Sequence, residues 1–205
     1  SVITVDGGDI VIARPVNQMT TQTIAAGTND AVLWKADLKV KQGVRLGDVT
    51  VVFETGGNFT GVVSTYFTTL KLKVGDRIIS TVNPTVNQNS FVFEGITDVN
   101  ANTTMEILGN VRSTIPGAAI FRIQTIQSSN FSTKEYVSNG NLVNSFIGSN
   151  QGIATTIDQT NATITKSDGL TNSSIVRGTS DKDVFGITIK AGATSSLNIS
   201  QLKFK

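Results

Sequence analysis

The stretch Ala31-Val-Leu-Trp-Lys-Ala-Asp-Leu-Lys-Val-Lys41 alternates apolar and charged residues from its fourth position onward. One set of alternating positions holds the apolar residues Trp34, Ala36, Leu38 and Val40. The positions between them hold the charged residues Lys35, Asp37, Lys39 and Lys41. Successive side chains of a β-strand point to opposite faces of its sheet, so this stretch is predicted to be a strand with one buried and one solvated face.

The same alternation recurs along the first two thirds of the chain. Leu70–Val74 and Phe121–Thr125 repeat it, and turn signals such as Gly56-Gly57 and Pro116-Gly117 separate the apolar runs. Further strands are predicted at Ile10–Ala13, Val49–Phe53, Ile78–Val82, Phe91–Glu94, Met105–Val111 and Ala118–Ile126. Strands that recur every 8–12 residues or so indicate an all-β sandwich or barrel. No segment has a convincing helical stripe, and Val63–Phe67 is ambiguous.

An internal repeat organises the chain. Shifted by 151 residues, Ile24-Ala-Ala-Gly27-Thr28-Asn-Asp30 falls on Ile175-Val-Arg-Gly178-Thr179-Ser-Asp181, and the apolar face of the following strand is preserved. We therefore expect a first β-sandwich unit over residues 1–127. A Ser/Asn/Gly-rich linker or inserted hairpin is expected over 128–159, and the first strands of a second, incomplete sandwich unit over 160–205.

This partial second unit poses a packing problem. Its apolar residues are predicted to form an interaction surface, and they are Phe185, Ile187, Ile189, Leu202 and Phe204. Each forgoes roughly 1.5–3 kcal/mol if it stays exposed to water. Three resolutions are open. The chain is a fragment of a longer tandem protein, or these strands pack into the first unit, or another subunit supplies the missing strands.

The repeated pattern has a familiar form. Ile24-x-x-Gly27-Thr28-x-Asp30, an amphipathic strand, and then Leu46-x-x-Val-x-Val-x-Phe53 resemble the immunoglobulin-like β-sandwich repeats of large prokaryotic cell-surface proteins of the S-layer, fibre and adhesin types. The resemblance covers Thr23–Ile126 and again Ser174–Phe204. It implies an immunoglobulin-like antiparallel β-sandwich at the cell exterior with an architectural or adhesive role. It transfers no catalytic residues.

Composition argues against catalysis and against two classes of partner. The chain has no Cys and no His, so thiol catalysis, a Ser-His-Asp triad and thiolate or imidazole metal ligands are excluded. No phosphate-binding glycine loop and no nucleophile elbow occurs. The 17 basic residues are spread along the chain, and no long apolar run is present. We therefore expect no enzyme activity, no nucleic-acid binding and no membrane insertion.

No cofactor is expected, and calcium is kept as a hypothesis. Asp98-Val-Asn100-Ala-Asn102 alternates oxygen ligands like the first half of a calcium loop, but it lacks the glycine and the distal glutamate of such a loop. A polar hairpin turn is the favoured interpretation. Asp6-Gly-Gly-Asp9 and Asp181-Lys-Asp183 offer oxygen ligands too, although such groups more often mark turns.

The leading functional hypothesis is a non-catalytic structural module of an extracellular surface assembly (an S-layer, fibre or stalk) joined to its neighbours by strand complementation. Its partners would be copies of itself or adjacent repeat units, with cell-wall polymer or glycan as a further candidate. The alternative is an adhesin or glycan-binding module, which would need a groove lined by Tyr66, Tyr136 or an exposed Phe. Trp34 is assigned to the core because it shares its face with Ala36 and Leu38.

Overall fold

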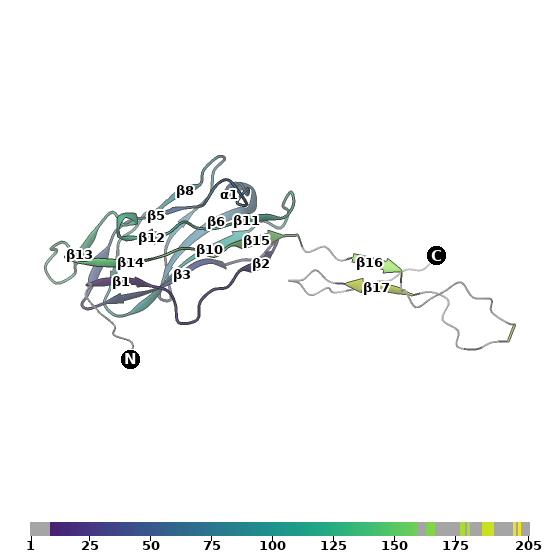
Figure 1. Cartoon of the computed structure of the whole chain (residues 1–205), viewed down its shortest axis with the longest axis horizontal. Helices are drawn as coiled ribbons and strands as arrows, with labels where there is room; N and C mark the ends of the chain where they lie inside the picture. Colours follow the sequence, from purple (N-terminus) through teal and green to yellow (C-terminus); the bar gives the residue numbers. More distant parts are fainter. Residues whose placement is uncertain are drawn as a thin grey trace. The chain divides into compact units, whose positions relative to one another are not determined.

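The computed structural model describes residues 9–159 without a gap, and beyond them residues 163–166, 177–178, 180, 186–190, 199 and 201. The chain divides into two compact units, Ser1–Asp158 and Gln159–Lys205. They are termed unit 1 and unit 2 (Figure 1). Among the described residues, no helix has the length and apolar content needed to cross a membrane.

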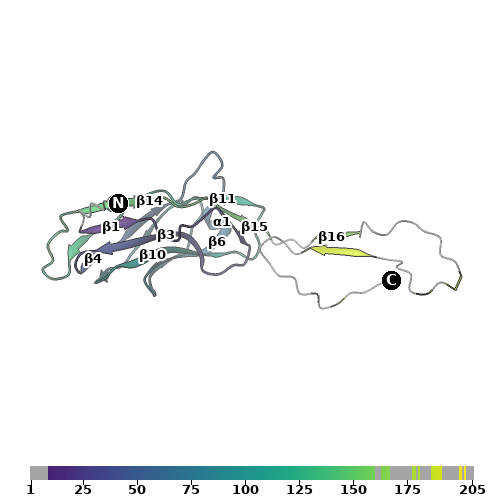
Figure 2. The same ribbon diagram turned by 60° about the horizontal axis from the view of Figure 1, so that its bottom comes forward.

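Unit 1 is built on a seven-stranded sheet with the strand order β12-β14-β1-β3-β10-β6-β7. In that order the strands are Ile126–Gln127, Phe146–Asn150, Ile10–Ala13, Ala31–Val40, Thr103–Val111, Phe67–Val74 and Arg77–Val82. Neighbouring strands are antiparallel except β1 and β14, which run parallel with Ile10 opposite Phe146. Figure 2 shows β1 and β14 side by side above β3.

Three smaller sheets complete unit 1. The first contains β11 (Ala119–Phe121), β15 (Thr155–Asp158) and β2 (Gln22–Ala25), in that order. The second contains β13 (Lys134–Tyr136), β4 (Val44–Leu46) and β9 (Thr97–Val99), and the third pairs β5 (Val49–Val52) with β8 (Ser90–Phe93). The ambiguous segment after β5 forms a single helical turn, α1 (Val63–Tyr66), and η1 (Ser128–Asn130) is a short 3-10 turn.

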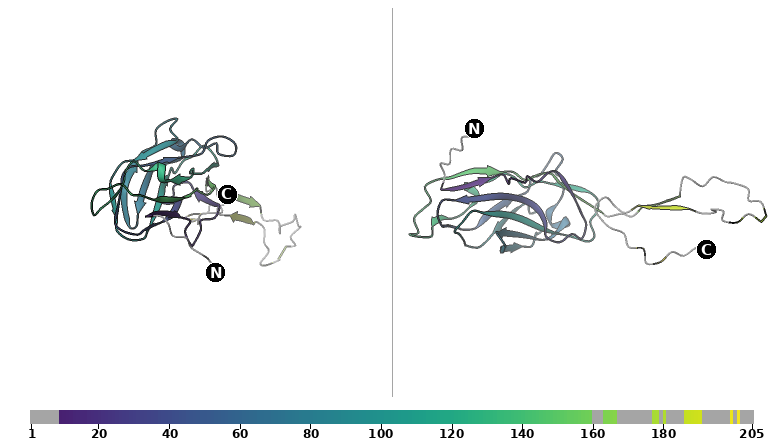
Figure 3. Two further views of the ribbon diagram at one scale, coloured as in Figure 1. Left: turned by 60° about the vertical axis from the view of Figure 1, so that its left-hand side comes forward. Right: turned by 90° about the horizontal axis from the view of Figure 1, so that it is seen from below.

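One hydrophobic core joins these sheets. The left view of Figure 3 shows how the strands of unit 1 curve. The apolar face predicted for Ala31–Lys41 is buried in β3, where Trp34 is 0% exposed and Leu38 is 1% exposed. Phe53 packs edge-on against Phe91 and Phe121, with ring centroids 5.8 and 6.3 Å apart, a favourable aromatic geometry. The predicted all-β sandwich architecture is confirmed.

The structure differs from the sequence-based boundaries at residues 128–159. This segment, expected to be a linker or an inserted hairpin after a sandwich ending at residue 127, supplies β13, β14 and β15, and unit 1 extends to Asp158. β14 lies between β12 and β1, and β15 lies between β11 and β2. The segment is therefore an integral part of the sandwich.

The physical reason for this difference lies in how the late strands are stabilised. β15 has a single large apolar side chain in the core, Ile157, which is fully buried. Its other buried residue, Thr155, is polar and accepts a hydrogen bond from the side-chain amide of Gln22 at 3.2 Å. A buried polar group with a partner costs little, so the strand needs no apolar alternation that the sequence could reveal.

Unit 2 contains two described strands. β16 (Thr163–Lys166) and β17 (Ile187–Lys190) form an antiparallel pair in which Ile164 lies opposite Ile189. Ile187 and Ile189 are half-buried on β17. The three aromatic and aliphatic residues expected to share their surface, Phe185, Leu202 and Phe204, lie outside the described residues.

Candidate functional site

The strand pair of unit 2 reproduces the first strand pair of unit 1. In unit 1, β1 and β3 are antiparallel with Ile12 opposite Leu38. In unit 2, Ile164 lies opposite Ile189 in the same antiparallel arrangement. Ile164 follows Ile12 by 152 residues, and Ile189 follows Leu38 by 151. The two pairs therefore have the same register if the segment between β16 and β17 is one residue shorter than the segment between β1 and β3. The two described strand pairs are therefore compatible with the repeat predicted from the sequence.

The turn ahead of β3 is repeated as well. Gly27 has φ of +82° and Gly178 has φ of +93°, both in the left-handed region that favours glycine. In unit 1 this glycine follows β2, and Thr28 then closes the turn by donating its side-chain hydroxyl to the carbonyl of Ala25 at 2.8 Å. The matching conformation of Gly178 supports an equivalent turn in the second unit.

The two strand pairs differ in what flanks them. In unit 1, β14 pairs with the outer edge of β1, and β10 pairs with the outer edge of β3. Among the described residues of unit 2, β16 and β17 pair only with each other. Leu38 of β3 is fully buried, whereas its counterpart Ile189 is half-buried. The outer edges of β16 and β17 are thus the positions where unit 1 places two further strands.

One signal upstream of β16 extends this correspondence, and sequence reasoning missed it. Thr156-Ile157-Asp158 of β15 matches Thr4-Val5-Asp6, with the same 152-residue offset that relates Ile164 to Ile12. Residues 4–6 lie outside the described part of the chain. The match would have drawn 155–158 into the repeat instead of the linker, because a repeat in the sequence extends over all matching segments.

Three of the candidate calcium ligands, Asp98, Asn102 and Asp9, have oxygen atoms engaged within the protein. Arg45 donates to both carboxylate oxygens of Asp98 at 2.8 and 3.1 Å, and this hydrogen bonding lowers the pKa of Asp98. Asn102 accepts from the backbone N–H of Val40 at 3.0 Å, and Asp9 accepts from the hydroxyl of Tyr136 at 2.6 Å. In the described ranges no three acidic residues gather as a metal site. Asp6, Asp181 and Asp183 lie outside those ranges.

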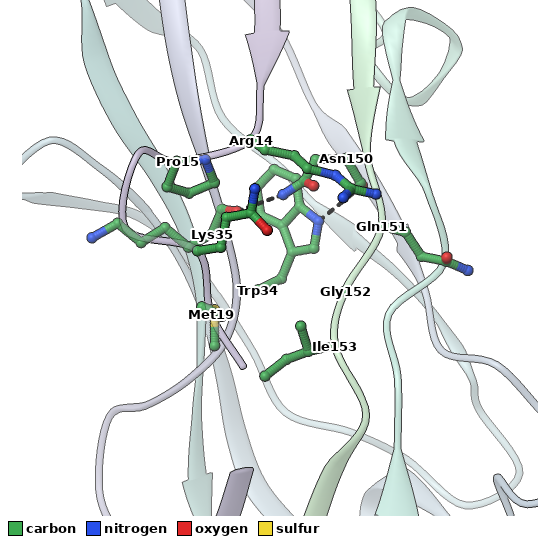
Figure 4. Close-up of a pocket in the computed structure, with 10 residues that line it drawn as sticks. Arg14, Pro15, Met19, Trp34, Lys35, Asn150, Gln151, Gly152 and Ile153 are labelled. Carbon is green, nitrogen blue, oxygen red and sulfur yellow. Dashed lines mark hydrogen bonds between the residues drawn. The ribbon is translucent and has the colours of Figure 1, made fainter. Parts of the chain in front are cut away.

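The aromatic residues considered for a binding groove are buried. Trp34 lies in the core as predicted, and its indole N–H donates to the backbone carbonyl of Asn150 at 3.0 Å. Figure 4 shows this indole close to Arg14 and Asn150, and all three residues line a small pocket of about 140 Å³. Tyr66 and Tyr136 are each only 7% exposed, so neither offers a ring face to a ligand.

A larger cleft lies beside the end of β5 and the start of β8. One of its lining residues is a partly buried phenylalanine, Phe59. Two loops form its walls, one joining β5 to α1 and the other joining β7 to β8. Its volume is about 540 Å³, within the range of small-molecule sites. The lining residues are Phe53, Glu54, Thr55, Gly56, Phe59, Thr60, Gly61, Val62, Val63, Asn87, Gln88 and Asn89. Of the residue types expected in a binding groove, the cleft contains one phenylalanine, and this residue is partly buried.

An ion-pair cluster occupies the outer face of the central sheet. Glu106 of β10 accepts from Lys35 of β3 and from Lys73 of β6, each at 3.1 Å. Burial alone would raise the pKa of Glu106, but hydrogen bonds and charge from the two lysines outweigh it and hold the pKa below the ordinary value of 4.5. The cluster therefore binds three strands together through one carboxylate.

Replacing Glu106 by glutamine is expected to destabilise unit 1 by about 2 kcal/mol at neutral pH, because Lys35 and Lys73 would then face each other without a counter-charge. A carboxyl with a lowered pKa in the folded state adds stability above its ordinary pKa and loses it as the pH falls through the lowered value. The difference from wild type should thus vanish in acid, as measured by urea midpoints across pH.

The matched control is Asp98→Asn, which breaks the exposed ion pair with Arg45 and should cost under about 1 kcal/mol. A loss in Glu106→Gln that stays constant between neutral and acidic pH would show that packing, and not charge, accounts for the effect.

Comparisons with protein families and with curated sequences found no relative of this chain. The fold and the sites described above place it in the class of all-β sandwich proteins, and its function is argued from its own residues.

Proposed function

We propose that this chain is a non-catalytic structural module of an extracellular surface assembly, built from immunoglobulin-like sandwich units in tandem. One observation carries the proposal: β16 and β17 repeat the pairing of β1 and β3 in register. A protein that begins the same sandwich a second time has the organisation of a repeat array, in which each unit adds length and contacts its neighbours.

The junction between units would be formed by strands. An unpaired strand edge presents a row of backbone N–H and C=O groups, and pairing with a further strand satisfies them. In unit 1 the edges of β1 and β3 are covered by β14 and β10. We propose that strands of the same kind, from an adjacent repeat unit or a copy of the chain, cover β16 and β17. Burying Ile187 and Ile189 would contribute roughly 1.5–3 kcal/mol each.

Replacing Ile187 by aspartate tests the junction. Ile187 occupies the position of Ala36, which is fully buried in β3, so a charge there should block the contact and leave unit 1 folded. The measurement is molar mass by light scattering over a concentration series, combined with amide hydrogen exchange of β16, β17 and β3. In the wild type, the mass and the protection of β17 should rise together with concentration, while β3 is protected throughout.

Thr188→Asp is the matched control, because Thr188 occupies the position of Asp37 on the solvated face of β3. It should assemble like the wild type, whereas Ile187→Asp should stay monomeric. If wild-type β17 is fully protected in a dilute monomer, its edges are covered by its own chain and complementation is wrong. Unfolding of unit 1 by Ile187→Asp would likewise contradict the proposal.

The alternative function, an adhesin or glycan-binding module, is favoured by one specific observation. The cleft beside Phe59 presents an aromatic ring and several amide groups at the surface of unit 1. A structural module and a binding module are compatible in one surface protein, because the strand edges of unit 2 and the Phe59 cleft share no residues.

A further inference from the structure

The cleft beside Phe59 has walls that are fixed before any ligand arrives. Gly56 and Phe59 exchange two backbone hydrogen bonds of 3.0 Å, and Gly56 and Gly57 adopt φ of +89° and +58° to close the hairpin between them. On the opposite wall, Gln88 accepts from the hydroxyl of Thr85 at 2.8 Å and donates to the carbonyl of Ser90 at 3.0 Å. Preformed walls spare a ligand the entropic cost of ordering them.

The ring of Phe59 is held in one place within this hairpin. The guanidinium of Arg122 lies 4.4 Å from its ring centroid, a cation–π distance. Arg122 is itself held by Glu54, whose Oε2 accepts from it at 2.6 Å. Val62, 45% exposed, adds apolar surface to the cleft, and the buried side chains of Phe53 and Val63 lie beneath its lining. The site thus offers a positioned aromatic ring beside an apolar floor.

The charge of the cleft restricts its ligands. Glu54 is the one charged residue that lines it, and its carboxylate is shared between Arg122 and the side-chain amide of Gln151, which donates to Oε1 at 2.9 Å. The other polar lining groups are the neutral amides and hydroxyls of Thr55, Thr60, Asn87, Gln88 and Asn89. A site whose single carboxylate is already neutralised does not favour an ionic ligand.

We propose that this cleft binds a neutral hexopyranose unit of an oligosaccharide. A pyranose ring has an apolar C–H face, which suits the ring of Phe59, and a rim of hydroxyls that both donate and accept hydrogen bonds. Carboxamides and hydroxyls do the same, so the lining matches that rim. This binding activity goes beyond the structural role and does not depend on it, because assembly uses β16 and β17 of unit 2.

Saturation-transfer NMR on the full chain tests the proposal with neutral oligosaccharides of glucose, mannose, galactose and N-acetylglucosamine. Transfer to the ring C–H protons of at least one of them is expected. Phe59→Leu keeps an apolar side chain in the hairpin but removes the aromatic face, and should weaken binding by about tenfold. Phe59→Tyr, which keeps the ring, should bind like the wild type.

The control variant is Asn58→Ala, the neighbour of Phe59 in the same hairpin, which does not line the cleft and should leave binding unchanged. The fluorescence of Trp34, which lies in the core, reports whether each variant is folded. No transfer to any neutral sugar overturns the proposal. So does equal weakening by Phe59→Leu and Asn58→Ala, or stronger binding of a uronic acid oligomer than of every neutral sugar.

Discussion

Replacing Ile157 by aspartate is expected to unfold unit 1. Ile157 lies on β15, is 0% exposed, and sits between β11 and β2, opposite Ala119 and Ile24. An unpaired carboxylate at this position would cost about 4 kcal/mol or more, a large part of the 5–15 kcal/mol that stabilises an ordinary domain. The loss is measured by far-UV circular dichroism during urea unfolding, with a lower midpoint or no cooperative transition as the expected result.

The control carries the same chemical change on a neighbouring late strand. Ile147 of β14 is 41% exposed, so Ile147→Asp should cost about 1 kcal/mol or less. Comparing the unfolding of Ile157→Asp and Ile147→Asp tests whether residues 128–158 belong to the sandwich. Were they a linker, Ile157→Asp would leave the unfolding transition of unit 1 where it is in the wild type.

Replacing Trp34 by alanine is the second change with a large expected effect. The indole is fully buried in β3, and its removal should destabilise unit 1 by about 3–5 kcal/mol through lost packing and the cavity left behind. The indole N–H also satisfies the carbonyl of Asn150, 116 residues away along the chain, and thereby joins β3 to β14. Far-UV circular dichroism during thermal or urea unfolding measures the loss.

Trp34→Phe separates the two contributions, and phenylalanine is the residue at the corresponding position of the repeat, Phe185. It keeps most of the ring but leaves the carbonyl of Asn150 without its donor, so a loss of about 1–2 kcal/mol is expected. If Trp34→Phe were as damaging as Trp34→Ala, the hydrogen bond rather than the packing would dominate. If both were harmless, the core assignment of Trp34 would fail.

Much of the fold could be predicted because its signals are local. The predicted strands Ile10–Ala13, Ile78–Val82 and Met105–Val111 correspond to β1, β7 and β10. In β1 and β10, alternating or continuous apolar residues meet the core within a few positions along the chain, so the signal is visible in the sequence. β7 lies at the edge of the sheet, where Ile79 and Val82 are only partly buried and Ile78 is 47% exposed, and its apolar residues alone indicated a strand. The predicted strand Ala118–Ile126 is shorter in the structure, where β11 ends at Phe121 and β12 begins at Ile126.

The candidate sites were only partly predictable. The sequence matches Ile187 and Ile189 to Ala36 and Leu38, and both isoleucines lie on β17, which pairs with β16. Their role as an interaction surface stays a prediction. The cleft beside Phe59 had no signal in the sequence, because its walls come from loops that are separate in the chain and that carry no motif. Whether a phenylalanine faces solvent or the core there depends on the hairpin between Gly56 and Phe59.

The sequence by itself determined the strand character of Ala31–Lys41 and the exclusion of thiol and imidazole chemistry, whereas the repeat that would begin a second sandwich stays a prediction. Only the tertiary structure decided that β15 closes unit 1, that Asn150 is the partner of Trp34, and that a cleft forms beside Phe59. The reason is the distance along the sequence between the residues that set each feature. Side-chain periodicity is set by neighbours along the chain, whereas strand pairing and clefts depend on backbone groups far apart in sequence, which carry no residue-specific pattern.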